Sequence, residues 1–150
     1  MATLLIVHHT PSPATHALLE AVRAGASDPQ IHGVDVVVRA ALEATAVDVL
    51  AADGYLLGTP ANLGYMSGAL KHFFDQIYYP CLDATIGRPF GLWVHGNNDV
   101  DGAVLAVERI VTGLGWRAVA DPLRVIGTPD QEALEAAREL GARTAAALIG

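Results

Sequence analysis

Residues 3–22, with the sequence TLLIVHHTPSPATHALLEAV, join an apolar run to a helical pattern through a short polar loop. The run Thr3–Val7 predicts a buried strand, because it is short, continuous and rich in aliphatic side chains. From His16 to Val22 the apolar residues recur at the i, i+3 and i+4 positions that form one face of a helix. This stretch therefore predicts a first strand that leads directly into a helix.

The loop between this strand and this helix has the composition of an anion site. Its hydroxyl residues precede a helix N-terminus, where unpaired backbone N–H groups and the helix dipole attract negative charge. The loop contains no Lys or Arg. That absence favours a phosphate held by hydrogen bonds, as in flavin mononucleotide (FMN) sites, over a nucleoside triphosphate with its metal. The residues predicted to contact the phosphate are Thr10, Ser12, Ala14 and Thr15.

The composition predicts one globular domain spanning residues 1–150. Hydrophobic residues make up 52% of the chain and charged residues only 17%, so disorder is not expected. A net charge of −7 with scattered basic residues argues against a nucleic-acid partner. No apolar stretch has the length of a membrane span, and no signal peptide is expected. The single cysteine, Cys81, excludes an internal disulfide, so we expect a cytoplasmic protein.

Apolar runs alternate with amphipathic segments along the whole chain. This alternation predicts a three-layer, doubly wound α/β fold, with a five-stranded parallel sheet of order 2-1-3-4-5. The expected strands are Leu4–His8, Asp35–Arg39, Gly54–Gly58, Phe90–His95 and Val119–Ile126. The expected helices are Thr15–Ala26, Ala46–Ala52, Ser67–Tyr79, Gly102–Leu114 and Asp130–Ile149. In such a sheet the loops after strands one, three and four surround one crevice, where ligands bind.

The loop after the third strand carries the most specific motif. Its sequence, GTPANLGYMSGALKHFFD at residues 58–75, resembles the flavodoxin-like superfamily and, within it, the NAD(P)H-dependent FMN reductase and quinone reductase branch. The phosphate loop matches that family through Thr10, Ser12 and Thr15, whereas Pro13 stands where the family usually has glycine. Proline has no N–H, so we expect one phosphate donor fewer.

The resemblance implies a bound FMN, with NADPH or NADH as a transient electron donor. It also implies a small-molecule acceptor such as a quinone, and assembly as a homodimer or homotetramer. The residues that it places around the flavin are Pro60, Ala61, Asn62, Leu63 and Gly64 after the third strand, and His95, Gly96, Asn97 and Asn98 after the fourth.

The histidines need separate interpretations. His8 and His9 are neighbours on a strand and point to opposite faces, so they cannot chelate one metal ion together, and we expect no metal site. His95 ends the fourth strand and is the candidate catalytic residue. It could hydrogen-bond the pyrimidine edge of the flavin, or give a proton to a quinone, or be structural.

Two functional classes follow from these observations. The first is an FMN-dependent oxidoreductase that passes electrons from NAD(P)H to a small acceptor, with small residues such as Ala61 and Gly64 leaving the ring accessible. The alternative is a flavodoxin-type carrier that binds FMN but does not oxidise nicotinamide itself. Carriers usually hold the ring between aromatic side chains, and here the loops offer only Tyr65. A cofactor-free member of the fold is a third possibility, which Pro13 supports.

Overall fold

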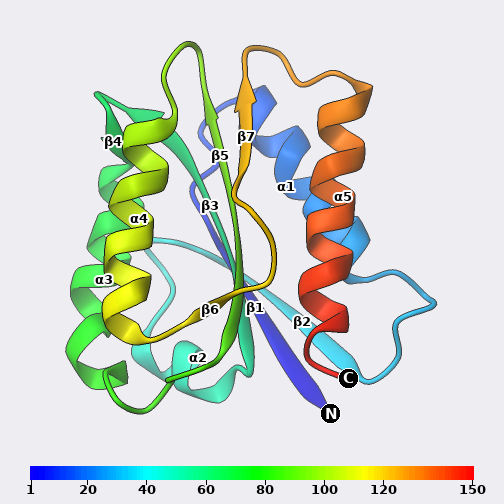
Figure 1. Cartoon of the computed structure of the whole chain (residues 1–150), viewed down its shortest axis with the longest axis vertical. Helices are drawn as coiled ribbons and strands as arrows, with labels where there is room; N and C mark the ends of the chain where they lie inside the picture. The colour runs from blue at the N-terminus through cyan, green and yellow to red at the C-terminus, as the bar shows by residue number, and fades with distance from the viewer.

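The computed structural model describes residues 1–150 (Figure 1). The helices are α1 (Pro13–Ala26), α2 (Ala46–Ala51), α3 (Gly68–Cys81), α4 (Asp101–Leu114) and α5 (Gln131–Ala146). The strands are β1 (Ala2–His8), β2 (Val34–Ala40), β3 (Gly54–Asn62), β4 (Tyr65–Met66), β5 (Pro89–Gly96), β6 (Arg117–Ala118) and β7 (Leu123–Ile126). None of these helices is both long enough and apolar enough to cross a membrane.

The sheet has the predicted parallel topology. Its order is β2-β1-β3-β5-β6, and β7 also pairs with β5. Apart from the short β4, every pairing is parallel. The prediction of a doubly wound fold with order 2-1-3-4-5 is therefore confirmed.

The predicted last strand, 119–126, was wrong in its bounds. The structure divides this region into β6 and β7, which pair with opposite ends of β5. Val119 still donates its N–H to the Phe90 carbonyl at 3.0 Å, and residues 120–122 run between the two strands. Pro122 stands just before β7 and has no N–H to offer a neighbouring strand. The apolar pattern alone did not reveal this break.

The loop after β3 also contains an element that was not predicted. β3 extends to Asn62 and pairs in antiparallel fashion with β4, where Ala61 is opposite Met66 and Asn62 is opposite Tyr65. The two turn residues both have positive φ, 52° at Leu63 and 74° at Gly64. Two such residues form the tight turn whose twist suits a β-hairpin.

Helices cover both faces of the sheet (Figure 1). Alternate strand residues divide between the two faces: Leu5 and Val7 pack with α2, α3 and α4, and Leu4 and Ile6 pack with α1 and α5. The larger cluster holds 25 buried residues and the smaller 12. Burial on both faces explains why the strands are apolar without clean alternation.

Candidate functional site

The β1–α1 loop ends in a tight reciprocal cap. Ser12 is the N-cap of α1, and its hydroxyl accepts the Thr15 N–H at 3.2 Å. In return the Ser12 N–H donates to the Thr15 hydroxyl at 3.0 Å, and that hydroxyl donates to the Ser12 carbonyl, also at 3.0 Å. The spacing that predicted phosphate ligands therefore also builds a capping box, and both hydroxyls already have partners within the loop.

Few backbone donors of this loop remain free for an anion. Pro11 and Pro13 have no N–H, and the His16 N–H donates to the Ser12 carbonyl at 2.9 Å. The N–H groups of Thr10 and Ala14 have no partner in the chain. The Thr10 hydroxyl lies 3.1 Å from His8 Nδ1. An anion at the N-terminus of α1 would therefore meet the helix dipole and the unpartnered Ala14 N–H. The Ser12 and Thr15 hydroxyls could bind it only by giving up their hydrogen bonds within the cap.

His8 adds no positive charge to this loop at neutral pH. Burial lowers the pKa of His8, and the nearby His9 lowers it further, while Glu43 opposes the shift. The neutral form is therefore favoured. No group of three or more His, Cys, Asp or Glu side chains lies close enough together to hold a metal ion.

The β3–β4 hairpin carries the predicted residues Pro60 to Gly64. Its base is fixed by Thr59, whose hydroxyl accepts the Ser67 N–H at 3.0 Å and donates to the Pro60 carbonyl at 2.8 Å. Its tip is open on the outer side, because the Leu63 side chain is fully exposed and a Cβ at Gly64 would meet nothing within 4 Å. The tip thus carries the exposed side chains of Leu63 and Tyr65 on either side of the open backbone at Gly64.

The β5–α4 loop packs directly against this hairpin. A Cβ at Gly96 would lie 3.3 Å from the Cβ of Ala61 and 2.9 Å from Val100. Beyond it, the Asn98 side chain accepts the Asp99 N–H at 2.6 Å. The close approach of the two loops requires glycine at position 96.

A cavity of about 440 Å³ lies where the start of α1 meets the end of β5. Its lining residues come from three loops and are Ser12, Pro13, Ala14, Ala17, His95, Asn97, Thr128 and Pro129. Four of the predicted site residues therefore meet here: Ser12, Ala14, His95 and Asn97.

The other predicted residues lie outside this lining. The hairpin residues Pro60 to Gly64 line no described cavity, and Thr10 belongs to a separate one of about 310 Å³ beside His8 and His9. The β7–α5 loop was missed, although Gly127-Thr128-Pro129 also follows a strand at the carboxyl edge. The loops expected around the crevice were those after strands one, three and four, and this loop follows the fifth predicted strand.

His95 is more buried than expected for a residue that was predicted to contact the substrate. Only 8% of it is accessible, and its Nε2 lies 2.8 Å from the carbonyl oxygen of Gly127. Its role as a catalytic residue stays a prediction.

Comparison with known proteins identifies the class of fold. A flavodoxin from the domain Archaea superposes with a TM-score of 0.84 over 99% of both chains, at 19% identity. The flavodoxin-type, WrbA-like protein of Agrobacterium tumefaciens superposes with a TM-score of 0.78, covering 97% of this chain and 96% of that one, at 22% identity. The protein therefore has the flavodoxin-like α/β fold.

A sequence relative then identifies the family. The flavodoxin of Aquifex aeolicus (strain VF5) is 31% identical over 164 residues, which cover 97% of this chain and 86% of that protein. No protein-family profile matches the chain. On the strength of this relative, the chain belongs to the flavodoxin family, and that membership supports FMN as the cofactor.

Proposed function

We propose that this protein is an FMN-binding electron carrier of the flavodoxin type. One observation carries the proposal: in a member of the flavodoxin family, the N-terminal turn of α1 and the carboxyl end of β5 open into one cavity of about 440 Å³. Ligands of doubly wound folds bind at this edge of the sheet.

The residues present fit such a cofactor. The N-terminus of α1 and the Ala14 N–H suit the phosphate, and the Ser12 and Thr15 hydroxyls would join them by exchanging their cap bonds. The hairpin of Pro60 to Gly64 and the loop of His95 to Asn98 would flank the ring. Bound FMN would supply the redox chemistry, and the chain would supply position and electrostatics.

An NAD(P)H-dependent oxidoreductase acting on a quinone or another small molecule is the second candidate function. The open space at Gly64 favours it, because a Cβ built there would meet nothing within 4 Å. The similarity to a WrbA-like protein agrees with this candidate at the level of fold.

This second candidate function includes self-association. We propose the exposed Tyr79 on α3 as part of the contact between copies.

The flavin assignment is tested by identifying the cofactor. We expect the purified or reconstituted protein to release one FMN per chain on heat denaturation, measured by chromatography against FMN and FAD standards. Recovery of FAD, or failure to take up any flavin, would overturn the assignment.

The choice between the two functions is tested anaerobically on the FMN-loaded protein. For a carrier, dithionite bleaches the flavin absorbance, whereas NADH and NADPH do not bleach it within minutes. Rapid bleaching by either nicotinamide would replace the carrier with the oxidoreductase.

A further inference from the structure

The hydrogen bond of His95 fixes which of its nitrogens carries a proton. A carbonyl oxygen only accepts, so the Nε2 that lies 2.8 Å from Gly127 O must be the N–H. In the neutral imidazole Nδ1 is then an acceptor with a free lone pair.

No group of the chain satisfies that lone pair. His95 is more than nine-tenths buried, yet its Nδ1 has no hydrogen-bond partner within the protein. His95 Nδ1 is nevertheless accessible. The side-chain nitrogen or oxygen that is fully buried without a partner is a different atom, His9 Nδ1. Because His95 lines the 440 Å³ cavity, its Nδ1 is available to a hydrogen-bond donor on a ligand there.

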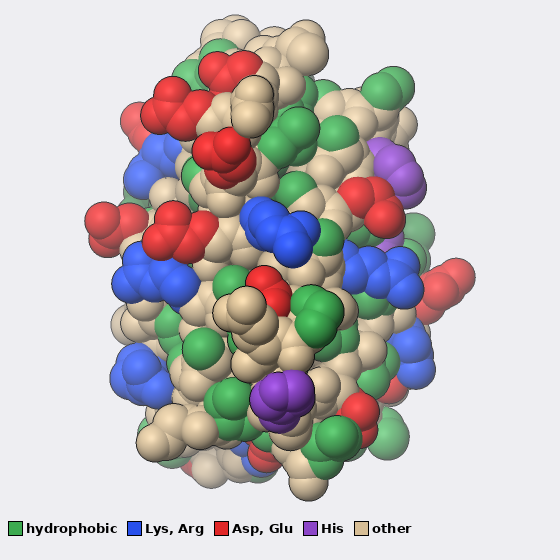
Figure 2. Space-filling view, turned by 90° about the vertical axis from the view of Figure 1, so that its right-hand side faces the viewer, with side chains coloured by type: hydrophobic (Ala, Val, Ile, Leu, Met, Phe, Trp, Pro, Cys, Tyr) green, Lys and Arg blue, Asp and Glu red, His purple; other side chains and the backbone are tan.

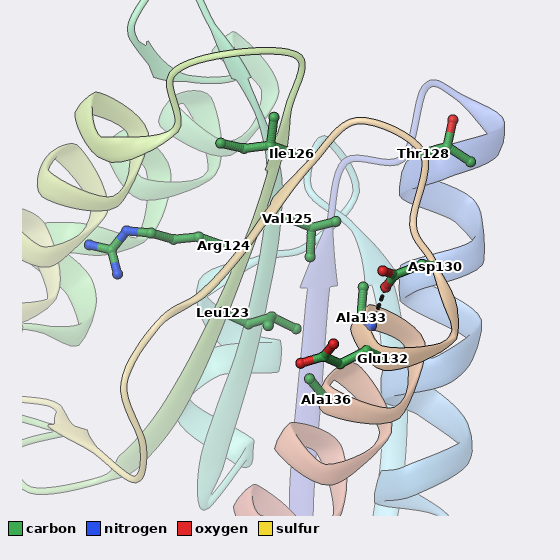
Figure 3. A pocket seen from close by; sticks show the side chains of 9 residues that line it. All are labelled: Leu123, Arg124, Val125, Ile126, Thr128, Asp130, Glu132, Ala133 and Ala136. Atoms are coloured by element: carbon green, nitrogen blue, oxygen red, sulfur yellow. Dashed lines mark hydrogen bonds between the residues drawn. The ribbon is translucent and has the colours of Figure 1, made fainter.

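The same hydrogen bond positions the β7–α5 loop. Gly127 accepts from His95 and donates its own N–H to the Gly96 carbonyl at 2.9 Å. At the other end of the loop, Asp130 caps α5 by accepting the Ala133 N–H at 2.8 Å (Figure 3). The loop is therefore fixed at both ends.

Thr128 lies between these two anchors and beside the cavity. Figure 3 shows it on the loop beyond β7, next to the first turns of α1, whereas Arg124 points the other way and bonds Asp101 at 3.0 Å. Thr128 is an exposed residue, and its hydroxyl makes no hydrogen bond within the chain. It is thus free to bind a ligand.

The polar lining of the cavity contains no Lys, Arg, Asp or Glu side chain. It consists of the hydroxyls of Ser12 and Thr128, the Asn97 amide and the His95 imidazole, with proline and alanine between them. Hydroxyls and the amide both donate and accept, and Nδ1 accepts. The lining has no Lys or Arg to pair with an anionic group, whereas a neutral polyhydroxylated chain offers the donors and acceptors that these side chains need.

We propose that this cavity binds the polyhydroxylated chain of the flavin, with Thr128 as a binding residue that the sequence motifs do not include. His95 has two parts in this site: its Nδ1 accepts from a ligand hydroxyl, and its Nε2–H positions the loop that carries Thr128. The proposal rests on the proposed flavin function and adds a fourth loop to the site.

Titration with three flavins distinguishes this proposal from the proposed flavin-binding function on which it rests. Lumiflavin has only the ring system, riboflavin adds the ribityl chain, and FMN adds the phosphate. Titration of each into the apoprotein, followed by flavin fluorescence, gives three dissociation constants per variant. We expect Thr128→Val to weaken riboflavin and FMN roughly three- to tenfold, because one neutral hydrogen bond is lost, and to leave lumiflavin unchanged. Thr128→Ser keeps the hydroxyl and is the matched control.

The positioning role of His95 is tested by coupling. The Gln side chain places its amide where Nε2 lies and can still donate to Gly127, whereas Asn reaches only as far as Nδ1. In His95→Gln, Thr128→Val should still weaken riboflavin binding. In His95→Asn its effect should be smaller, because the side-chain bond to the Gly127 carbonyl is lost and the Gly127 N–H to Gly96 bond is left to hold that end of the loop.

Two outcomes would overturn the proposal. Equal effects of Thr128→Val on all three flavins, or no effect on any, would exclude a contact with the ribityl chain while leaving flavin binding intact. If the unmodified protein binds none of the three, the proposed function fails as well. Far-ultraviolet circular dichroism of each variant verifies that the fold is retained.

Discussion

At the scale of single residues, Tyr55 joins three elements of the larger core. It is fully buried, its hydroxyl donates to the Val49 carbonyl at 2.6 Å, and it accepts from Arg88 at 3.1 Å. Its ring stacks on Trp116 at 4.0 Å. Burial raises the pKa of Tyr55 from 10.0 to about 12, although Arg88 opposes the shift. The folded state therefore favours the protonated phenol.

This shift predicts a loss of stability in alkali. As the pH rises above 10 the unfolded chain loses the Tyr55 proton while the folded chain retains it, so the stabilisation is complete below pH 10 and is lost toward pH 12. Urea unfolding of the protein and of Tyr55→Phe at pH 9 and pH 11 measures it. The difference between the two free energies of unfolding should shrink by about 1.4 kcal/mol at pH 11. A constant difference would contradict the assignment to Tyr55.

Residue roles were predictable from sequence only where both partners are local. Ser12 and Thr15 lie three positions apart in the loop that was predicted to precede a helix, and they cap that helix. The His95 ring is hydrogen-bonded to Gly127, which is 32 positions away. Its strand-end position was predictable, but its buried hydrogen bond was not, because no local pattern specifies a partner at that separation.

At the scale of elements, the β3–β4 hairpin rests on the first turn of α4. A Cβ at Gly102 would collide with the carbonyl oxygen of Gly64, so the two backbones are in direct contact. The first residue of α3, Gly68, has open space around it. These two glycines flank the same hairpin in opposite environments.

Alanine at these two positions should therefore have opposite effects. Gly68→Ala should leave stability unchanged or raise it by up to about 1 kcal/mol, because alanine favours a helix. Gly102→Ala should lower the free energy of unfolding by about 1–3 kcal/mol, because the hairpin and helix must separate. Urea unfolding measures both, and titration with FMN should show weaker binding for Gly102→Ala alone. Equal stability of the two variants would show that the hairpin adapts freely.

Elements were predicted where the apolar pattern was long enough to have a period. The four long helices and the central strands were predicted within a few residues of their bounds. The two-residue β4 was not, because two residues show no periodicity, although Gly64 marked a turn. The break between β6 and β7 was missed for a related reason: Val119 to Ile126 is apolar enough to suggest one strand, and pairing with β5 decides where it is interrupted.

At the scale of the whole molecule, the parallel sheet brings the loops after β1, β3, β5 and β7 to one edge (Figure 1). This convergence was predictable, since the carboxyl ends of parallel strands share an edge. Which loops then enclose a cavity depends on how α1 and α5 pack together. That packing places Thr128 and Ser12 around one cavity. It depends on Gly25 and Gly141, each of which lies against the backbone of the other helix, and sequence spacing does not reveal these contacts.

The charge of the molecule favours positively charged protein partners. The net charge is −7, and on the face that bears α5 the Asp and Glu side chains lie mainly toward the end where these loops meet (Figure 2). An acidic surface near the proposed site would attract a basic electron-transfer protein and raise its rate of association. This attraction is screened as salt is added, because the Debye length falls from about 30 Å at 0.01 M ionic strength to about 10 Å at 0.1 M.

Electron transfer from the reduced, FMN-loaded protein to a basic cytochrome should therefore depend on salt. We expect its second-order rate constant to fall at least about tenfold between 0.01 M and 0.5 M ionic strength, measured by anaerobic stopped-flow absorbance. An uncharged small quinone is the control, and its rate should not change, because a neutral acceptor feels no net attraction. A cytochrome rate that is insensitive to salt would show that charge does not guide the encounter. Fast transfer to the quinone together with slow, salt-independent transfer to the cytochrome would favour the small-acceptor oxidoreductase over the carrier.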